Sequence, residues 1–250
     1  MKACCLIYLE ENSGAMTKSI KSISVFFPFY NEESNVTRMC DVALEVVPKI
    51  TDDYEIILVN DGSVDGTRDA IDALVNKHDH VIGVHHETNG GYGAALQSGF
   101  KRASKAWIFY TDGDAQFDLN ELPGLIDLTG SYDIITCYRQ NRQEGFMRKC
   151  NAHFWGKLVS FVFKLRIKDI DCAFKLYRSE IFDEIKMEST GALIDTEILA
   201  RAQRAGYTMI QRGVTHHPRI SGESSGANIS VIIKAFKELF VLRKKILSNN

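Results

Sequence analysis

The 250-residue sequence lacks the features of several protein classes. None of its hydrophobic runs approaches the roughly 18 apolar residues of a membrane-spanning helix. The six cysteines include no CxxC pair, so zinc-site spacing is missing and we expect reduced thiols. The net charge of −2 lacks the basic excess of a general nucleic-acid binder, so no nucleic-acid partner is expected.

Two common nucleotide-binding signatures are also missing. A dinucleotide-binding Rossmann domain carries GxGxxG after its first strand, and P-loop proteins carry a phosphate-binding lysine motif. Here the first predicted strand, residues 23–29, runs into Tyr30, Asn31 and Glu32 without a glycine, and the lysine motif does not occur. A nucleotide site in this chain must therefore be built from other residues.

The composition that is present is that of a globular protein, with 45% hydrophobic and 25% charged residues. The length fits one large α/β domain with a substantial core. We divide the chain into an N-terminal extension at 1–20, a domain at 21–228, and a C-terminal amphipathic helix with its tail at 229–250. The apolar start is too short for a signal peptide.

Strands and helices alternate regularly in the first half of the domain. Hydrophobic, β-branched runs predict strands at 23–29, 54–60, 81–85 and 106–111. Helices are predicted between these strands. The first ends near Val47, and the next two span 65–76 and 94–103. This alternation predicts a mostly parallel, Rossmann-like sheet flanked by helices. Ligands of such sheets bind at the carboxyl ends of the strands, where this sequence carries PFYNEE, NDGSVDG, NGGYG and DGDAQFD.

The pattern loosens after Asp118. The further elements predicted there are helices at 121–128, 147–165, 194–205 and 229–247, and strands at 132–137, 172–177 and 207–214. Residues 139–178 carry ten Lys and Arg against three Asp and Glu, although the whole chain is slightly acidic. This segment can therefore bind an anionic partner.

Asp112 and Asp114 directly follow the strand at 106–111. Two carboxylates two residues apart at a strand end can hold a hard divalent cation, Mg²⁺ or Mn²⁺, with substrate phosphates completing its coordination. A polar turn capped by aspartates is the alternative, because a single DxD is a weak signal.

The other strand ends supply groups suited to a nucleotide. Asp61 can accept a hydrogen bond from a nucleobase ring N–H, while Tyr30 and Glu32 can pack on the base and bond the nucleoside. The glycine-rich turn at 89–93 lets backbone approach a ligand closely. Because all four strand ends carry residues that suit a nucleotide or its metal ion, we predict a nucleoside diphosphate site.

The sequence also holds two adjacent histidine pairs, His85 with His86 and His216 with His217. Neighbouring side chains on a strand point to opposite faces, so such a pair does not make a metal chelate. We assign these histidines to packing or surface roles.

The combined motifs resemble those of the family-two glycosyltransferases with the GT-A fold, and among them the dolichyl- or polyprenyl-phosphate sugar synthases. The matching segments are VFFPFYNEE at 25–33, VNDGSVDGT at 59–67, NGGYGAA at 89–95, DGDAQFD at 112–118, DCAFK at 171–175 and IDTE at 194–197. The resemblance covers roughly residues 23–226. It is specific for the family and much less so for the sugar or the acceptor.

The resemblance implies roles for individual residues. The nucleoside pocket is expected to include Pro28, Tyr30, Glu32, Asp61 and Asp112. Asp112 is expected at the ribose or the metal, and Asp114 with Gln116 at a Mg²⁺ or Mn²⁺ ion near the diphosphate. Groups expected at the phosphates or the acceptor are Arg139 in the loop after 132–137, Arg142, Arg148, Arg219, Ser224 and Ser225. Metal and arginines suit this place because negative charge develops on the departing diphosphate.

Asp195 and Glu197 open the helix at 194–205. In relatives with hydroxyl acceptors an Asp in this region is a general base, so we count both among the catalytic candidates. A lipid phosphate is already ionised and needs little deprotonation, and acids at a helix N-terminus are also favoured by the helix dipole. The role of base and the role of helix-terminal acid both stay open.

The function implied is that of a metal-dependent, inverting hexosyltransferase. It would move a sugar from a UDP- or GDP-linked donor to a polyprenyl or dolichyl phosphate. The alternatives are transfer to a hydroxyl of a glycan or lipid with Asp195 as base, and a sugar-nucleotide-binding subunit without turnover.

The implied acceptor lies in a membrane. The basic segment 139–178 and the helix at 229–247 suit an anionic lipid surface. Packing of that helix on the core or on a second subunit is the alternative. We expect a cytoplasmic protein held peripherally at the cytosolic membrane face, with a membrane-embedded partner or a homodimer as further options.

Overall fold

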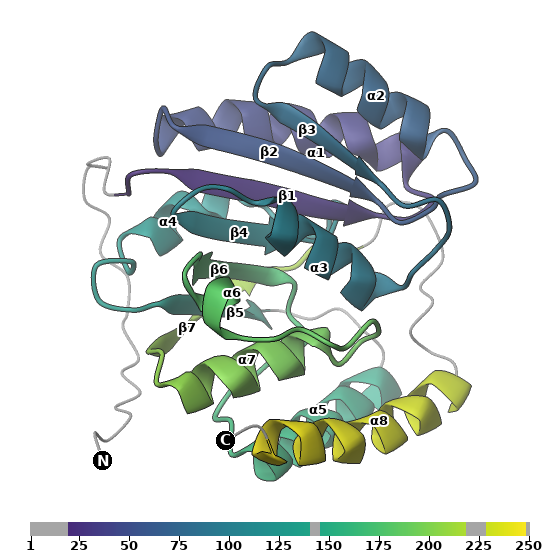
Figure 1. Cartoon of the computed structure of the whole chain (residues 1–250), viewed down its shortest axis with the longest axis vertical. Coiled ribbons are helices and arrows are strands. Elements are labelled where there is room, and N and C mark those ends of the chain that lie inside the picture. Colours follow the sequence, from purple (N-terminus) through teal and green to yellow (C-terminus); the bar gives the residue numbers. More distant parts are fainter. Residues whose placement is uncertain (1–19, 141–145, 219–228, 249–250) are drawn as a thin grey trace.

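The computed structural model describes residues 20–140, 146–218 and 229–248. Its centre is a seven-stranded sheet with the order β3-β2-β1-β4-β6-β5-β7 (Figure 1). The strands are β1 Ile23–Phe29, β2 Tyr54–Asn60, β3 Val81–His85, β4 Trp107–Thr111, β5 Ile134–Gln140, β6 Phe174–Arg178 and β7 Met209–Thr215. Strands β1 to β4 are parallel to one another, as are β5 and β7, whereas β6 runs antiparallel to both of its neighbours. The prediction of a mostly parallel sheet is thereby confirmed.

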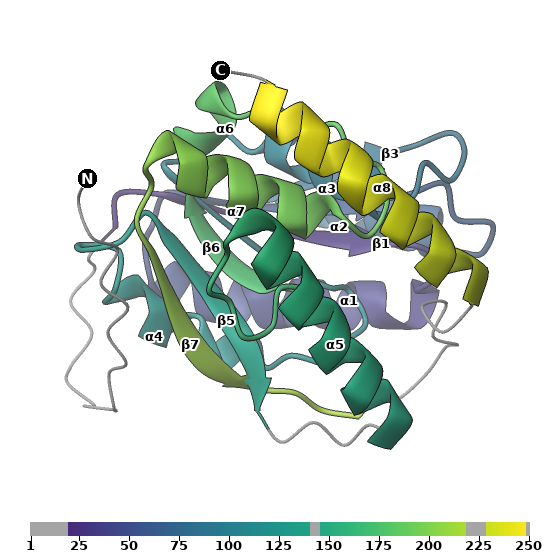
Figure 2. The same cartoon turned by 90° about the horizontal axis from the view of Figure 1, so that it is seen from below.

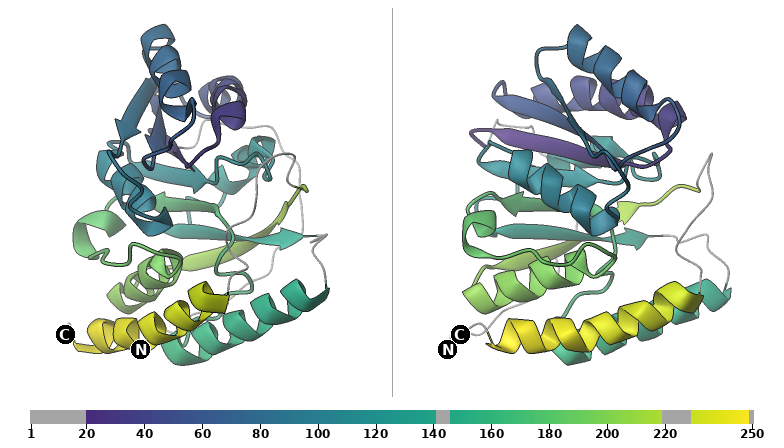
Figure 3. Two further views of the ribbon diagram at one scale, coloured as in Figure 1. Left: turned by 90° about the vertical axis from the view of Figure 1, so that its right-hand side faces the viewer. Right: turned by 45° about the vertical axis from the view of Figure 1, so that its right-hand side comes forward.

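Helices cover both faces of this sheet. Helices α3, α6 and α7 lie on one face, and α1 and α4 on the other, which is clearest edge-on (Figure 3). The helices are α1 Glu33–Val46, α2 Thr67–Lys77, α3 Tyr92–Arg102, α4 Pro123–Ile126, α5 Phe146–Phe163, α6 Ile181–Glu184, α7 Ile194–Ala205 and α8 Ile229–Ser248. Short 3-10 turns occupy Val47–Lys49 and Leu119–Glu121.

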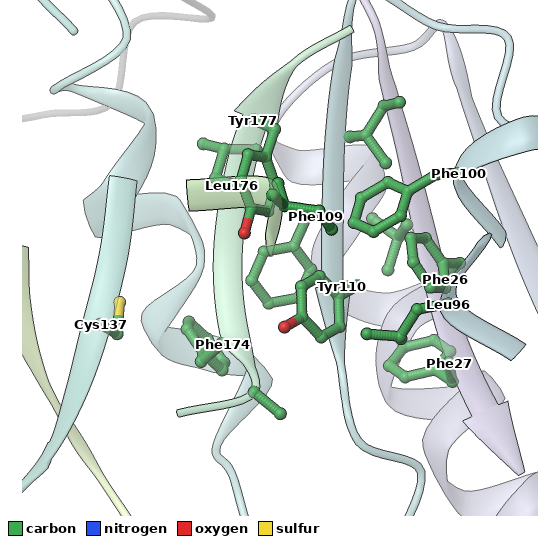
Figure 4. Packing of buried hydrophobic residues seen from close by; sticks show 14 of the residues in the cluster. Phe26, Phe27, Leu96, Phe100, Phe109, Tyr110, Cys137, Phe174, Leu176 and Tyr177 are labelled. Carbon is green, nitrogen blue, oxygen red and sulfur yellow. The ribbon is translucent and has the colours of Figure 1, made fainter. Parts of the chain in front are cut away.

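Strands β1, β2 and β4 read as continuous apolar runs because helices bury them on both sides. The core between β1, β4, β6 and α3 is largely aromatic (Figure 4). Phe26 meets Phe100 edge-on at a centroid distance of 4.9 Å and stacks on Tyr110 at 5.4 Å. Tyr110 in turn stacks on Tyr177 of β6 at 6.4 Å. These contacts join the parallel half of the sheet to the rest.

Helices α5 and α8 lie side by side at the β7 end of the molecule (Figures 1 and 2). Helix α8 packs inward through Leu239, Leu242 and Ile246, which belong to the core. It exposes Phe240 and Val241 on its other side. Within the described parts of the chain, no helix combines the length and apolar character that crossing a membrane requires.

One strand is longer than the sequence indicates. The predicted strand 132–137 is observed as Ile134–Gln140, because β5 keeps pairing with β7 up to Gln140 opposite Thr215. Arg139 therefore lies within β5, and its placement in the loop after the strand is wrong. The apolar run stops at Cys137, so the sequence alone gives no sign of this extension.

Candidate active site

The carboxyl ends of β1, β2 and β4 meet at one edge of the sheet. Phe29, the last residue of β1, pairs with Asn60, the last residue of β2. Tyr30, Asp61 and Asp112 follow these strand ends directly and so gather at the same edge. The structure thus brings together the nucleotide-site residues predicted from three separate motifs.

Asp61 is buried and holds the glycine-rich turn. Its Oδ1 accepts hydrogen bonds from Gly90 N at 2.9 Å and from His86 Nδ1 at 2.6 Å. Its Oδ2 accepts one from Gly91 N at 3.0 Å. The described residues therefore use three of the roughly four acceptor positions of this carboxylate and leave one on Oδ2.

The turn at 89–93 connects this aspartate to the neighbouring motif. Gly91 has a φ of +94°, where a side chain is strained, and its Cβ would lie 2.7 Å from Thr190 O. The next residue, Tyr92, donates a hydrogen bond from its hydroxyl to Asp112 Oδ1 at 2.9 Å. Burial and the Asp112 charge raise the pKa of Tyr92 well above its usual range, so it stays a donor.

The Asp112–Gly113–Asp114 turn fits a divalent cation. Burial and the neighbouring charge of Asp114 raise the pKa of Asp112 to about 7, which a cation between the two carboxylates would reverse. Among the described residues no group of three or more His, Cys, Asp or Glu gathers, so two carboxylates are the protein's main contribution. Mg²⁺ and Mn²⁺ suit such a set, since they are often held by one or two carboxylates plus substrate phosphates.

Gln116, the third predicted ligand, is anchored beside this turn. Its backbone N donates to Asp114 Oδ1 at 3.2 Å, and its side-chain Nε2 donates to His217 O at 3.0 Å. Ala115 between them has a φ of +59°, an unusual conformation for a residue with a side chain. The local backbone is thus bent sharply where the predicted metal ligands stand.

The Phe29 ring packs against Gly113 and leaves no room for a side chain at this position. A Cβ at this position would lie 2.4 Å from ring carbons of Phe29, which is buried. We expect Gly113→Ala to lower the free energy of unfolding by about 1–3 kcal/mol, because this contact overpacks the core. It should also displace Asp112 and Asp114. Urea unfolding measures the first effect and metal-induced thermal stabilisation the second.

Gly130→Ala provides the matched control, because a Cβ there meets no atom within 4 Å. Equal unfolding midpoints for the Gly113 and Gly130 variants would contradict the tight packing of the turn on Phe29.

The remaining nucleoside residues differ in exposure. Tyr30 is 47% exposed and so available to a base, and Pro28 is half-buried. Glu32 is buried, its carboxylate accepts a hydrogen bond from Asn35 Nδ2 at 2.6 Å, and its backbone N donates to Thr67 Oγ1 at 3.1 Å. Glu32 therefore also orders the start of α1.

A buried ion pair stands behind the Asp112 turn. Asp195 Oδ1 accepts hydrogen bonds from Lys175 Nζ at 2.7 Å and from the Tyr110 hydroxyl. Lys175 is fully buried and also donates to Cys172 O at 2.6 Å and to Tyr110 Oη at 3.1 Å. All three ammonium donors are satisfied. Among the described residues, Asp195 Oδ2 takes no hydrogen bond.

Glu197 follows Asp195 by two residues in α7 and is fully buried. Its Oε1 accepts from Arg201 Nε at 2.9 Å, and its Oε2 accepts from the backbone N atoms of Glu188 at 3.0 Å and Ser189 at 2.7 Å. The sequence places Glu197 among the catalytic residues. In the structure both carboxylate oxygens are engaged, one by Arg201 and the other by the 188–189 backbone, and a catalytic role for Glu197 stays a prediction.

Arg139 is held by a carboxylate in this structure. Its Nε and Nη2 lie 2.8 Å from the two oxygens of Asp169, a bidentate pair. Asp169 thereby engages one edge of the guanidinium, and the diphosphate contact of Arg139 stays a prediction. Arg142, Arg219, Ser224, Ser225 and the side chain of Arg148 lie outside the described residues.

Sequence reasoning gave no site role to four residues, Lys175, Tyr110, Tyr92 and His86, although Lys175 and Tyr92 stand in the matching motifs. Lys175 lies between Phe174 and Leu176 in β6, which is the signal that could have indicated a buried partner. The other three become visible only when strand ends and α3 are brought together.

Comparison with known proteins gives a consistent result. The glycosyl transferase family 2 model matches residues 24–186. The undecaprenyl-phosphate 4-deoxy-4-formamido-L-arabinose transferase of Aeromonas hydrophila is 30% identical over 210 residues, covering 82% of this chain and 63% of that relative. The Yersinia pestis transferase of the same name is 29% identical over 171 residues, covering 68% and 52%. The chain thus spans about half to two thirds of the length of these relatives.

Solved structures with the same fold carry metal and nucleotide. Glucosyl-3-phosphoglycerate synthase from Mycobacterium tuberculosis, in complex with Mn²⁺, UDP-glucose and phosphoglyceric acid, matches with a TM-score of 0.69 at 15% identity. The match covers 90% of this chain and 80% of that one. A mannosyltransferase from Pyrobaculum calidifontis, in complex with GDP-Man and Mn²⁺, matches with a TM-score of 0.65 at 18% identity, covering 91% and 65%. At these identities the matches establish the fold.

Proposed function

Since the chain belongs to glycosyl transferase family 2, we propose that it transfers a sugar from a UDP- or GDP-linked donor to a polyprenyl phosphate, with inversion at the anomeric carbon. The observation that carries this proposal is the meeting of the Asp61 turn with Asp112 and Asp114 at one sheet edge. The sequence relatives, whose names specify undecaprenyl phosphate, support the choice of acceptor.

The chemistry follows from the leaving group. The acceptor oxygen forms a bond to the anomeric carbon as the bond to the diphosphate oxygen breaks, so negative charge develops on the departing diphosphate. Asp114, with Asp112 and Gln116, would hold Mg²⁺ or Mn²⁺, which neutralises that charge when bound. Asp61 would bind the base and Tyr30 would stack on it. Fixed groups such as these need no reorganisation during the reaction.

Asp195 fits a phosphate acceptor better than a hydroxyl acceptor. Its Oδ1 is engaged by Lys175 and Tyr110 and its side chain is buried, which suits a fixed positioning group better than a general base that must reach an acceptor proton. A phosphate acceptor arrives ionised and needs no base. We therefore propose that Asp195 is a positioning residue, which holds the side chains of Lys175 and Tyr110 in place beside the acceptor site.

The decisive experiment is nucleoside diphosphate release by the purified chain. The assay supplies UDP- and GDP-sugars, Mg²⁺ or Mn²⁺, and undecaprenyl or dolichyl phosphate, and omits each component in turn. Release that needs one donor, the metal and the lipid phosphate supports the proposal. Release that proceeds equally with a glycan hydroxyl and no lipid phosphate would overturn the acceptor. Donor binding without release from any acceptor would indicate a binding subunit.

We also propose that helices α5 and α8 rest on the cytosolic membrane face, where such a lipid phosphate is reached. Their described parts expose large apolar side chains among basic ones. Phe154 and Phe161, one heptad apart on α5, are 72% and 84% exposed, and Phe240 on α8 is 57% exposed. Arg243 and Lys244, three and four residues after Phe240 on α8, are exposed as well. Aromatic groups that enter the interface and cations that meet anionic headgroups are the pattern of a peripheral helix.

We expect Phe154→Ser with Phe161→Ser to reduce binding to vesicles of phosphatidylglycerol and phosphatidylcholine by about tenfold or more, because each buried Phe contributes about 1.5–3 kcal/mol. Arg243→Gln with Lys244→Gln should also lose about 30-fold in binding to these vesicles, at about 1 kcal/mol per charge, and nothing in binding to pure phosphatidylcholine. Cosedimentation measures both.

Val64→Ser, at a residue 88% exposed on the loop after β2, is the matched control and should bind vesicles as the wild type does. Unchanged binding by the double Phe variant would remove α5 from the proposed membrane surface.

A further inference from the structure

His86 joins the proposed base-binding aspartate to helix α3. Its Nδ1 lies 2.6 Å from Asp61 Oδ1, and its Nε2 lies 2.8 Å from Ser98 Oγ. Its backbone is fixed too, since His86 N donates to Asn60 O at 2.9 Å. His86 is thus held at three points beside the end of β2, two on its imidazole and one on its backbone.

The direction of these hydrogen bonds is determined by Asp61. An ionised carboxylate only accepts, so His86 Nδ1 must carry the proton of this contact. Ser98 Oγ can either donate or accept, and it fits the imidazole in either charge state. The contact to Asp61 joins a donor to a charged acceptor, and such hydrogen bonds are about twice as strong as neutral ones.

The order Ser98–His86–Asp61 is that of a hydrolase triad, but the surroundings of Ser98 do not support nucleophilic catalysis. Ser98 lies inside α3, between Tyr92 and Arg102, where the backbone N–H groups are used by the helix. No adjacent pair of such groups is left to stabilise an oxyanion. The chain of contacts therefore acts on Asp61 and not on Ser98.

What the contacts do to Asp61 follows from counting its acceptors. Gly90 N and His86 Nδ1 fill Oδ1, and Gly91 N takes one position on Oδ2. The carboxylate cannot rotate without breaking contacts from two different segments. A single acceptor position on Oδ2 is then presented in a fixed direction.

We propose that His86 is a positioning residue for nucleobase recognition, which orients Asp61 so that its last acceptor selects a base with a ring N–H. This inference rests on the proposed function, because it takes Asp61 as the base-binding group. Uracil and guanine carry a ring N–H on the edge concerned, whereas cytosine presents a ring nitrogen that only accepts. Selection against cytidine nucleotides is thus the signature of the His86 contact.

Two isosteric variants separate the contacts of His86. In His86→Asn the amide Nδ2 takes the place of Nδ1 and can still donate to Asp61, while the contact to Ser98 is lost. In His86→Gln the amide Nε2 takes the place of the other ring nitrogen and keeps Ser98, while the donor to Asp61 is lost. Calorimetry with UDP, GDP and CDP in the presence of Mg²⁺ gives the affinities, and thermal unfolding gives the stability of each variant.

We expect His86→Asn to bind UDP or GDP within about threefold of the wild type. His86→Gln should bind the preferred nucleotide about tenfold more weakly, with CDP unchanged, so that base selectivity falls by the same factor. A merely structural role would lower stability in both variants and leave the ratio of UDP or GDP to CDP affinity unchanged.

The outcomes are distinguishable. If the wild type binds no nucleoside diphosphate, the proposed function fails and this inference falls with it. If the wild type binds UDP or GDP selectively and His86→Gln retains both affinity and selectivity, the inference on His86 alone is overturned.

Discussion

Lys175→Met is expected to lower the free energy of unfolding by about 3–5 kcal/mol, because it leaves the buried charge of Asp195 without its cation. Lys175 is fully buried on β6, and its ammonium group bridges Asp195, Tyr110 and the Cys172 carbonyl. Burial and the Asp195 charge hold the pKa of Tyr110 well above its usual range, so Tyr110 stays a neutral hydroxyl that can donate to Asp195 but cannot balance its charge. Urea unfolding followed by circular dichroism measures the change.

Two controls show whether the effect comes from the unpaired charge. Lys49→Met removes an exposed cation that lies 3.1 Å from Glu45, and should change stability by about 0.5 kcal/mol or less. The double variant Lys175→Met with Asp195→Asn removes both buried charges and should recover most of the loss. A double variant as unstable as the single one would contradict the ion-pair explanation and point to lost packing.

Asp114→Asn is expected to lower the rate of nucleoside diphosphate release by about 100-fold or more. The change removes one of two carboxylates that fit a divalent cation, and electrostatic stabilisation of a leaving group is typically worth several kcal/mol. We expect Mn²⁺ to stabilise the wild type against thermal unfolding and the variant to lose this stabilisation. Release and thermal unfolding, each with and without Mn²⁺, measure the two effects.

Asp118→Asn is the matched control, four residues further along the same segment. Asp118 Oδ1 accepts from Asn120 N at 3.0 Å and caps a 3-10 turn, a contact that an asparagine oxygen can also make. Its release rate and Mn²⁺ response should stay near those of the wild type. If Asp114→Asn matched Asp118→Asn in both measurements, the metal assignment would be wrong.

Local sequence was sufficient for elements whose signals are contained in a few neighbouring residues. The strand at 81–85 and the helix at 194–205 have the predicted bounds, since an apolar run defines the first and Gly206 ends the second. The direction of β6 was not predictable in this way. It depends on pairing with β4 and β5, which are distant in the sequence.

The same distinction holds for the site. Asp61, Asp112 and Asp114 were predictable because each directly follows a recognisable strand. His86 was assigned to packing on the rule that neighbouring side chains on a strand diverge. The rule holds for the pair, because His85 contacts Asp72 whereas His86 contacts Asp61, but it says nothing about partners from another element. Asp61 meets His86 once β2 pairs with β3, and Ser98 reaches it once α3 docks on the sheet.

Strand β6 also determines the order in which a growing chain can complete its sheet. By the time residue 111 has left the ribosome, β1 to β4 can pair in their final order, with β4 at the margin. All five residues of β4 are buried in the finished protein, yet its partner β6 begins 63 residues after Thr111, at Phe174. The nascent chain therefore carries an unpaired apolar strand for as long as that stretch takes to synthesise. Such a strand is a template for wrong pairing with other chains. Production of this protein should accordingly depend on chaperones and on translation speed more than on the stability of its native state.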